Sequence, residues 1–191
     1  MKNKINLAIL ASGSGSNAEN IVQYFEQHEI IQVKEILSNK KDAFVHERAK
    51  KLNIPSYTFS KEEFQDTSFI KRLADIDYIV LAGFLWLIPK YLVSAFQNRI
   101  INIHPALLPK YGGKGMYGDR VHKSVIDARE RKSGITIHLV DEKYDEGAHL
   151  FQAECLISDQ DTPQTLAQKI HKLEYEHFPQ VIEKYIRSRA K

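Results

Sequence analysis

The sequence predicts an α/β protein with a single Rossmann-like domain, in which helices cover both faces of a mostly parallel central sheet. Short apolar runs alternate with segments of helical periodicity, and a glycine-rich turn joins the first apolar run to the first helical segment. Strands and helices that alternate at this spacing form parallel βαβ units with right-handed crossovers. A third observation is the run from Ile100 to His104, an apolar strand that ends in polar side chains.

The first half of the chain repeats the strand–helix unit. Residues 5–10 are a nearly continuous apolar run, and Ile21, Val22 and Phe25 after it have the spacing of one helix face. Pro89 opens a short helix in the favoured first-turn position. We expect strands at 5–10, 30–37, 54–59, 78–82 and 100–104, and further helices at 43–52, at 62–74 and after Pro89.

The second half of the chain does not continue the regular alternation of strands and helices. Four glycines lie within residues 110–118, which predicts a loop with little structure of its own. We expect a short helix at 121–128 and strands at 135–140 and 150–157. A helix start at 161–163 opens a long terminal helix, whose inward face is marked by Leu166, Ile170, Leu173 and His177.

Composition is that of an ordinary globular chain of 191 residues, with 43% hydrophobic and 27% charged residues. This length fits one domain over residues 1–191, with halves at about 1–100 and 101–191.

Cys155 is the only cysteine, which excludes an intramolecular disulfide and favours a reducing compartment. We expect Cys155 to be a buried strand thiol. The net charge is +3, and basic residues are interleaved with acidic ones along the chain. No apolar run has membrane-spanning length. We therefore expect a cytoplasmic protein that binds neither nucleic acid nor membrane.

The turn at residues 13–18 fits the G-x-G-x-x-A pattern between a strand and a helix. Glycines let the backbone approach a phosphate, and a helix start attracts an anion. A dinucleotide site would also need an acid at the end of the second strand, but Glu35 falls in the middle of that strand. A single phosphate monoester is therefore the better ligand. A plain tight turn, capped by Ser16 or Asn17, remains the alternative.

Asn102 and His104 share one face of their strand, and Pro105 ends it. The carboxyl end of such a strand is where α/β sheets place their chemistry. Asp145 is the best partner for His104, because Gly147 allows a tight return and a carboxylate neighbour favours the protonated imidazole. The alternative is a structural histidine and a solvated acid. The eight histidines form no H-E-x-x-H pattern, so we expect no catalytic metal, and no G-x-S-x-G elbow is present.

Together these motifs resemble the folate-dependent phosphoribosylglycinamide formyltransferases over nearly the whole chain. Their order and spacing are specific, whereas any one alone would be weak. The matching pieces are residues 12–17 (SGSGSN), 81–84 (LAGF), 102–105 (NIHP), 107–111 (LLPKY), 133–138 (SGITIH) and 145–147 (DEG), followed by Gln152.

The resemblance implies the formyltransferase fold and a formyl transfer from 10-formyltetrahydrofolate to the amine of glycinamide ribonucleotide in purine biosynthesis. It implies that Asn102, His104 and Asp145 are catalytic, with Asn102 and Asp145 also near the folate. The substrate's 5′-phosphate would bind Gly15, Ser16 and Asn17, and its ribose hydroxyls would bind Glu174, beside the inward stripe of the last helix. The folate would contact Lys61, Leu85, Trp86, Leu87, Ile88 and the segment from Val140 to Asp145. The half of the domain at about 1–100 would bind the phosphate, and the half at about 101–191 would bind the folate and carry out catalysis. A monomer or weak homodimer is expected.

Two departures from the family pattern stand out. Trp86 replaces an arginine, and the segment from Gly112 to His122 is longer and richer in glycine than usual. Two other functions stay open at this point. A formyltetrahydrofolate hydrolase would use the same catalytic residues with water as the acceptor. A nucleotide-binding module without catalysis would need only the glycine-rich turn.

Overall fold

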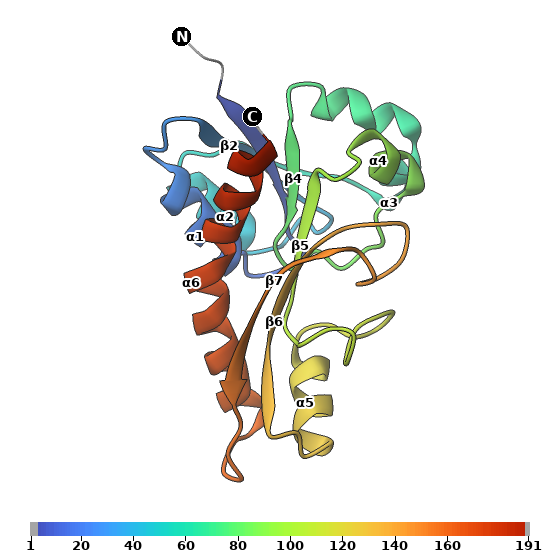
Figure 1. Cartoon of the computed structure of the whole chain (residues 1–191). Coiled ribbons are helices and arrows are strands. Elements are labelled where there is room, and N and C mark those ends of the chain that lie inside the picture. The colour runs from blue at the N-terminus through green and yellow to red at the C-terminus, as the bar shows by residue number, and fades with distance from the viewer. Residues whose placement is uncertain (1–3, 190–191) are drawn as a thin grey trace. The chain divides into compact units, whose positions relative to one another are not determined.

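The computed structural model describes residues 4–189, and the chain divides into two compact units, residues 1–101 and 102–191. Seven strands are hydrogen-bonded in the order β3-β2-β1-β4-β5-β6-β7 (Figure 1). The predicted fold class is confirmed, because the sheet is mostly parallel and helices flank it. That the chain is one domain with two functional halves stays a prediction.

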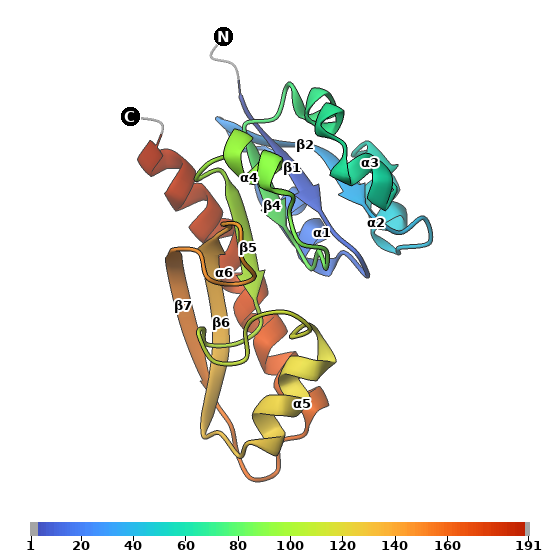
Figure 2. The same ribbon diagram turned by 90° about the vertical axis from the view of Figure 1, so that its right-hand side faces the viewer.

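The first unit contains four complete strands and their connecting helices. They are β1 (Ile5–Leu10), α1 (Ser16–Phe25), β2 (Ile31–Ser38), α2 (Val45–Lys51), β3 (Ser56–Thr58), α3 (Lys61–Gln65), the 3₁₀ helix η1 (Thr67–Leu73), β4 (Tyr78–Leu81) and α4 (Lys90–Ala95). Helices α1 and α2 lie on one face of these strands, and α3 and α4 on the other (Figures 1 and 2).

Parallel pairing gathers the carboxyl ends of the strands in the first unit. Leu10 at the end of β1 pairs with Leu37 of β2 and with Leu81 of β4. The connections that follow these three strands therefore start at the same edge of the sheet. The glycine-rich turn after β1 and the segment after β4 meet there, because Ser12 Oγ accepts a hydrogen bond from Leu85 N at 3.0 Å.

Two predicted helices of this unit differ from the structure. Residues 62–74 form α3 and η1 rather than one helix, because Asp66 is extended and its side chain accepts a hydrogen bond from Ser68 N at 2.7 Å. Pro89 is the extended N-cap of α4 and not its first helical residue. The third strand is also shorter than the predicted 54–59.

Strand β5 (Ile100–His104) spans the boundary of the two units, and the second unit continues with α5 (Asp119–Asp127), β6 (Lys132–Leu139), β7 (His149–Leu156) and α6 (Pro163–Arg189). Strands β6 and β7 pair antiparallel, with His138 opposite His149. Helix α6 packs on β6 and β7, and α5 packs on α6 (Figure 2).

The buried stripe of α6 differs from the predicted one. Leu166 and Ile170 are buried as expected, but Leu173 and His177 are only half-buried. Instead, buried residues recur every fourth position, and Glu174 lies within this stripe rather than beside it, with 5% of its surface exposed. A carboxylate in an apolar stripe needs polar partners.

Cys155 is a free thiol on β7 and is half-buried, not fully buried as predicted. Among the helices between residues 4 and 189, none is both long enough and apolar enough to cross a membrane.

Candidate active site

The end of β5 presents Asn102 and His104 as predicted. The strand spans Ile100–His104, with Ile101 and Ile103 buried on the other face. Asn102 is half-buried and His104 is 4% exposed. Both side chains belong to the second unit, which also contains Asp145, so the three predicted catalytic residues can be described together.

Both ring nitrogens of His104 face acceptors. Nδ1 lies 3.5 Å from Oδ2 of Asp145, and Nε2 lies 2.8 Å from the backbone carbonyl oxygen of Tyr111. The imidazole is therefore held between a carboxylate and a carbonyl. Its Nε2–H can donate to another group only after the Tyr111 carbonyl moves away.

The predicted direction of the shift in the pKa of His104 is wrong. Burial lowers the pKa of His104 below its usual value, although the Asp145 carboxylate and the Tyr111 carbonyl both act to raise it. Desolvation penalises the charged imidazolium, and in this pair it outweighs the two favourable contacts. The sequence pattern identified the partner of His104 but not the depth at which the pair is buried.

Asn102 reaches Asp145 through His138, a residue to which sequence reasoning assigned no role. His138 Nδ1 lies 2.8 Å from the Leu139 carbonyl oxygen, so Nδ1 carries the proton and donates it there. His138 Nε2 lies between the two side chains, 3.0 Å from Asn102 Nδ2 and 3.6 Å from Asp145 Oδ1. The sequence contained one signal for this residue. His138 is the last buried residue of β6, just as His104 is the last residue of β5.

Asp145 is placed by the backbone around it. Gly147 packs so closely on the Leu139 carbonyl that a Cβ there would overlap it, so glycine is needed at this point of the connection. Gly113 N donates a hydrogen bond to Asp145 Oδ2 at 2.9 Å. Burial raises the pKa of Asp145, but His138, His104 and the Gly113 amide together lower it below its ordinary value. Asp145 is therefore an anion at neutral pH.

A buried threonine fixes the turn that follows β5. Thr136 Oγ1 donates to the Ala106 carbonyl at 2.7 Å and accepts from Leu108 N at 3.0 Å. Gln152 on β7 adds a hydrogen bond from Nε2 to the Leu108 carbonyl at 3.1 Å. These bonds anchor the backbone that carries the chain from His104 to Tyr111.

The glycine-rich segment is tied to the rest of the unit at its start. Lys110 Nζ and Tyr111 Oη both donate to Glu130 Oε1, at 2.8 and 2.9 Å. The Tyr111 carbonyl and the Gly113 amide contact His104 and Asp145 as described above. Helix α5 begins at Asp119, two residues before the predicted start and directly after the predicted loop at residues 110–118.

The glycine-rich turn of the first unit leads directly into α1, as predicted. Gly15 is the N-cap of α1 and has a left-handed φ of 74°, and a Cβ there would also overlap Val45. The N-cap of α1 is therefore Gly15 rather than Ser16 or Asn17, and the alternative of a plain tight turn stays a prediction. Arg48 Nε donates to the Ser14 carbonyl at 2.9 Å and so brings a guanidinium to the turn.

The other predicted folate residues of the first unit lie after β4 and at the start of α3. Ile88 is buried, whereas Leu85 and Leu87 are 36% and 40% exposed. Trp86 packs its ring near Phe59, with centroids 6.0 Å apart, in a cluster that also contains Phe64 and Phe84. Lys61 is the first residue of α3 and is exposed.

Glu174 of the second unit has a histidine partner. Its Oε2 lies 2.9 Å from His171 Nδ1, and this hydrogen bond raises the pKa of His171. The contact balances the charge of a carboxylate that lies in an otherwise apolar stripe. Val140, a predicted folate residue, is half-buried directly after β6.

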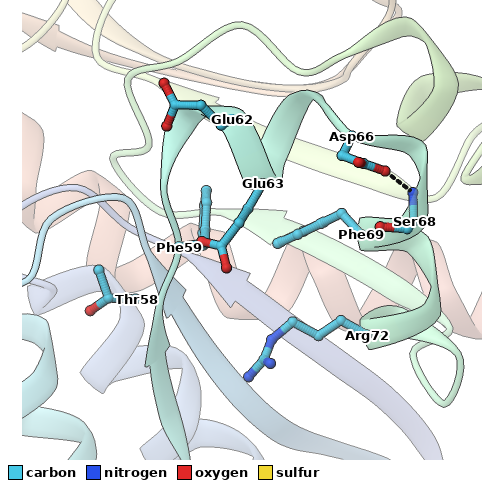
Figure 3. A pocket seen from close by; sticks show the side chains of 8 residues that line it. All are labelled: Thr58, Phe59, Glu62, Glu63, Asp66, Ser68, Phe69 and Arg72. Atoms are coloured by element: carbon cyan, nitrogen blue, oxygen red, sulfur yellow. Dashed lines mark hydrogen bonds between the residues drawn. The ribbon is translucent and has the colours of Figure 1, made fainter.

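One surface pocket of the first unit contains no predicted site residue. Figure 3 shows carboxylates from α3 and the guanidinium of Arg72 around it. Two of its acids have local partners, since Glu63 accepts from Ser60 N at 2.6 Å and Asp66 caps η1. Its lining residues are Thr58, Phe59, Glu62, Glu63, Asp66, Ser68, Phe69 and Arg72. This acidic lining does not suit a phosphate.

Comparison with known proteins agrees with this geometry. Residues 5–182 match the family model described as formyl transferase, and the chain belongs to this family. Similar proteins carry a more particular name. The phosphoribosylglycinamide formyltransferase of Bacillus subtilis strain 168 is 35% identical over 187 residues, which are 94% of this chain and 93% of that protein.

Two further proteins carry the same name. The chloroplastic phosphoribosylglycinamide formyltransferase of Arabidopsis thaliana is 40% identical over 185 residues, or 92% of this chain. This chain spans only 63% of the length of that relative. The crystal structure of the Bacillus halodurans phosphoribosylglycinamide formyltransferase has a TM-score of 0.86 at 34% identity, with 97% of each chain covered.

We predict that His104 titrates below its ordinary value of about 6.5 and that Asp145→Asn lowers its pKa further. The substitution removes a carboxylate that favours the imidazolium but leaves the burial unchanged. Imidazole NMR signals followed against pH measure this, and His171, with its raised pKa, serves as the internal comparison. An increase in the pKa of His104 in Asp145→Asn would contradict this account.

Proposed function

We propose that this protein transfers the formyl group of 10-formyltetrahydrofolate to the amine of N1-(5-phosphoribosyl)glycinamide, in purine biosynthesis. The observation that carries the proposal is the buried pair of His104 Nδ1 and Asp145 Oδ2, 3.5 Å apart, at the end of β5 beside Asn102. Membership of the formyl transferase family supports the type of reaction. The names of the bacterial and plant relatives support the choice of acceptor.

The reaction needs hydrogen-bond donors for an oxyanion. Attack of the amine on the formyl carbon puts negative charge on the formyl oxygen, and donors aimed at that oxygen lower the barrier. We assign this role to an N–H of His104 and to the amide of Asn102, whose NH₂ group has a second proton besides the one directed at His138.

His104 gains charge as the reaction proceeds rather than carrying it from the start. Burial keeps the pKa of the resting imidazole low. A developing oxyanion beside the ring is an opposite charge, which raises the pKa of His104 and strengthens its hydrogen bond. Asp145, an anion on the other side of the ring, stabilises that change.

Asp145 also accepts the proton that the attacking amine loses. The amine nitrogen gains positive charge when it attacks and must lose a proton before the C–N bond to the leaving nitrogen breaks. We propose that the Asp145 carboxylate takes this proton through water and that the leaving nitrogen receives a proton in return.

We assign the substrate-binding residues as the resemblance to the family implies. The helix start at Gly15, Ser16 and Asn17 binds the 5′-phosphate through its backbone N–H groups and the positive end of the helix dipole. The nearby Arg48 guanidinium is paired with Glu19 and has no role in this assignment. Glu174 binds the ribose hydroxyls. The exposed apolar side chains of Leu85 and Leu87, together with Trp86, Ile88, Val140 and Asp145, hold the folate, and Lys61 attracts its carboxylates. The folate supplies the formyl group and leaves as tetrahydrofolate.

The contact between His104 Nε2 and the Tyr111 carbonyl belongs to the resting enzyme in this proposal. Substrate binding then requires the Tyr111 carbonyl to turn away from His104. The four glycines that follow Tyr111 permit such a change of backbone conformation, because glycine has no Cβ to clash. The single thiol, Cys155, fits our proposal that the enzyme works as a monomer or weak homodimer in the reducing cytoplasm.

Asp145→Asn is expected to fold normally and to lose turnover on the order of a hundredfold, since it removes the charge that supports His104. Formyl folate consumption measured by absorbance, together with thermal melting, provides the test. Glu146→Gln is the matched control, because Glu146 is the exposed neighbour of Asp145 and pairs with Lys143 on the same loop. Near-normal turnover of Asp145→Asn would remove Asp145 from the mechanism.

Dependence on the acceptor separates this function from its alternatives. Consumption of 10-formyltetrahydrofolate should occur only when glycinamide ribonucleotide is present, with formylglycinamide ribonucleotide as the product. Consumption without the acceptor would favour the hydrolase. No consumption in either case, with phosphate binding retained, would favour a nucleotide-binding module.

A further inference from the structure

Helix α5 buries a histidine against α6. The buried residues of α5 are Val121, His122 and Val125, and His122 is 3% exposed. Valine suits such an interface, but an imidazole carries two nitrogens that need hydrogen-bond partners when water is excluded. The position of His122 therefore requires an explanation beyond packing.

The Nδ1 atom of His122 is buried without a hydrogen-bond partner among the residues that the structure describes. More than nine in ten buried polar groups in folded proteins are paired with protein atoms or ordered water. A buried orphan nitrogen marks a place that another molecule completes, either an ordered water or a ligand.

The surroundings of His122 are unusually polar for a helix interface. The charges that act on it come from His171 and Glu174 on α6, from Asp119 on its own helix and from His104 at the end of β5. Glu174 is itself 5% exposed and accepts a hydrogen bond from His171 Nδ1 at 2.9 Å. His122 and Glu174 are thus two buried polar groups that interact, whereas His171 and Asp119 are exposed.

The chemistry of this cluster selects a neutral ligand with hydroxyl groups. The Glu174 carboxylate repels a phosphate or another anion, and His171 already balances its charge, which weakens the attraction for a cation. A carboxylate only accepts hydrogen bonds, whereas a neutral imidazole nitrogen either donates or accepts. A hydroxyl group does both, so a sugar diol can pair with Glu174 and His122 together.

We propose that His122 binds a ribose hydroxyl of the acceptor through Nδ1 and completes with Glu174 the subsite for the ribose. The inference rests on the proposed function and adds His122 to it as a binding residue. The expected contribution is to the affinity for the ribonucleotide and not to the chemical step.

The test compares His122→Leu with His122→Asn. Leucine removes both ring nitrogens, whereas the asparagine amide lies about where Nδ1 does. Calorimetry should show glycinamide ribonucleotide bound about tenfold more weakly by His122→Leu and nearly normally by His122→Asn. Binding of the 2′,3′-dideoxy counterpart should be the same in all variants. Lys123→Gln, an exposed change on the same helix, is the control and should bind both ligands normally.

Thermal melting without ligand completes the test. His122→Leu should melt no lower than the wild type, because it removes an unpaired polar atom from an apolar interface. Unchanged affinity in His122→Leu, an equal loss for both ligands, or no recovery in His122→Asn would overturn the proposal and leave His122 Nδ1 to an ordered water.

Failure of the proposed function has a separate signature. It would appear as a wild type that transfers no formyl group to glycinamide ribonucleotide. The same comparison made with ribose 5-phosphate as the probe would still decide whether His122 contacts a ribose. A loss of ribose 5-phosphate affinity in His122→Leu supports the subsite, and unchanged affinity refutes it.

Discussion

The buried contact between His104 and Asp145 is the interaction on which the candidate site depends. Asp145 favours charge on the imidazole, and burial opposes it, so the ring rests with a lowered pKa while its partner stays an anion. An exposed pair would be screened by water and would respond little to charge developing on a substrate. Burial keeps the pair sensitive to such a charge, which is what stabilisation of an oxyanion requires.

Much of the second unit serves to hold this pair. The Tyr111 carbonyl and the Gly113 amide bind His104 and Asp145 from the glycine-rich segment, and Thr136 fixes the turn between β5 and that segment. His138 links Asn102 to Asp145. Two backbone groups and two side chains therefore orient the reactive groups, and the strands beneath them supply the rigidity.

Sequence reasoning found the strands, most helices and the three residues of the candidate trio, because these follow from periodicity and from motifs at strand ends. It missed the break at Asp66 and the buried position of Glu174, because both depend on local capping and on long-range packing. It also reversed the shift of the pKa of His104. A partner can be inferred from the spacing of motifs, but the depth of burial depends on the whole fold.

A double-mutant cycle on the rate constant kcat/KM tests the central claim, that His104 and Asp145 act as one unit. His104→Asn, Asp145→Asn and the double variant are compared with the wild type in the formyl transfer assay. If the two residues act together, the double variant should be no more than a few times slower than the worse single variant. Losses that multiply, so that two effects of about a hundredfold become about ten-thousandfold, would contradict the account.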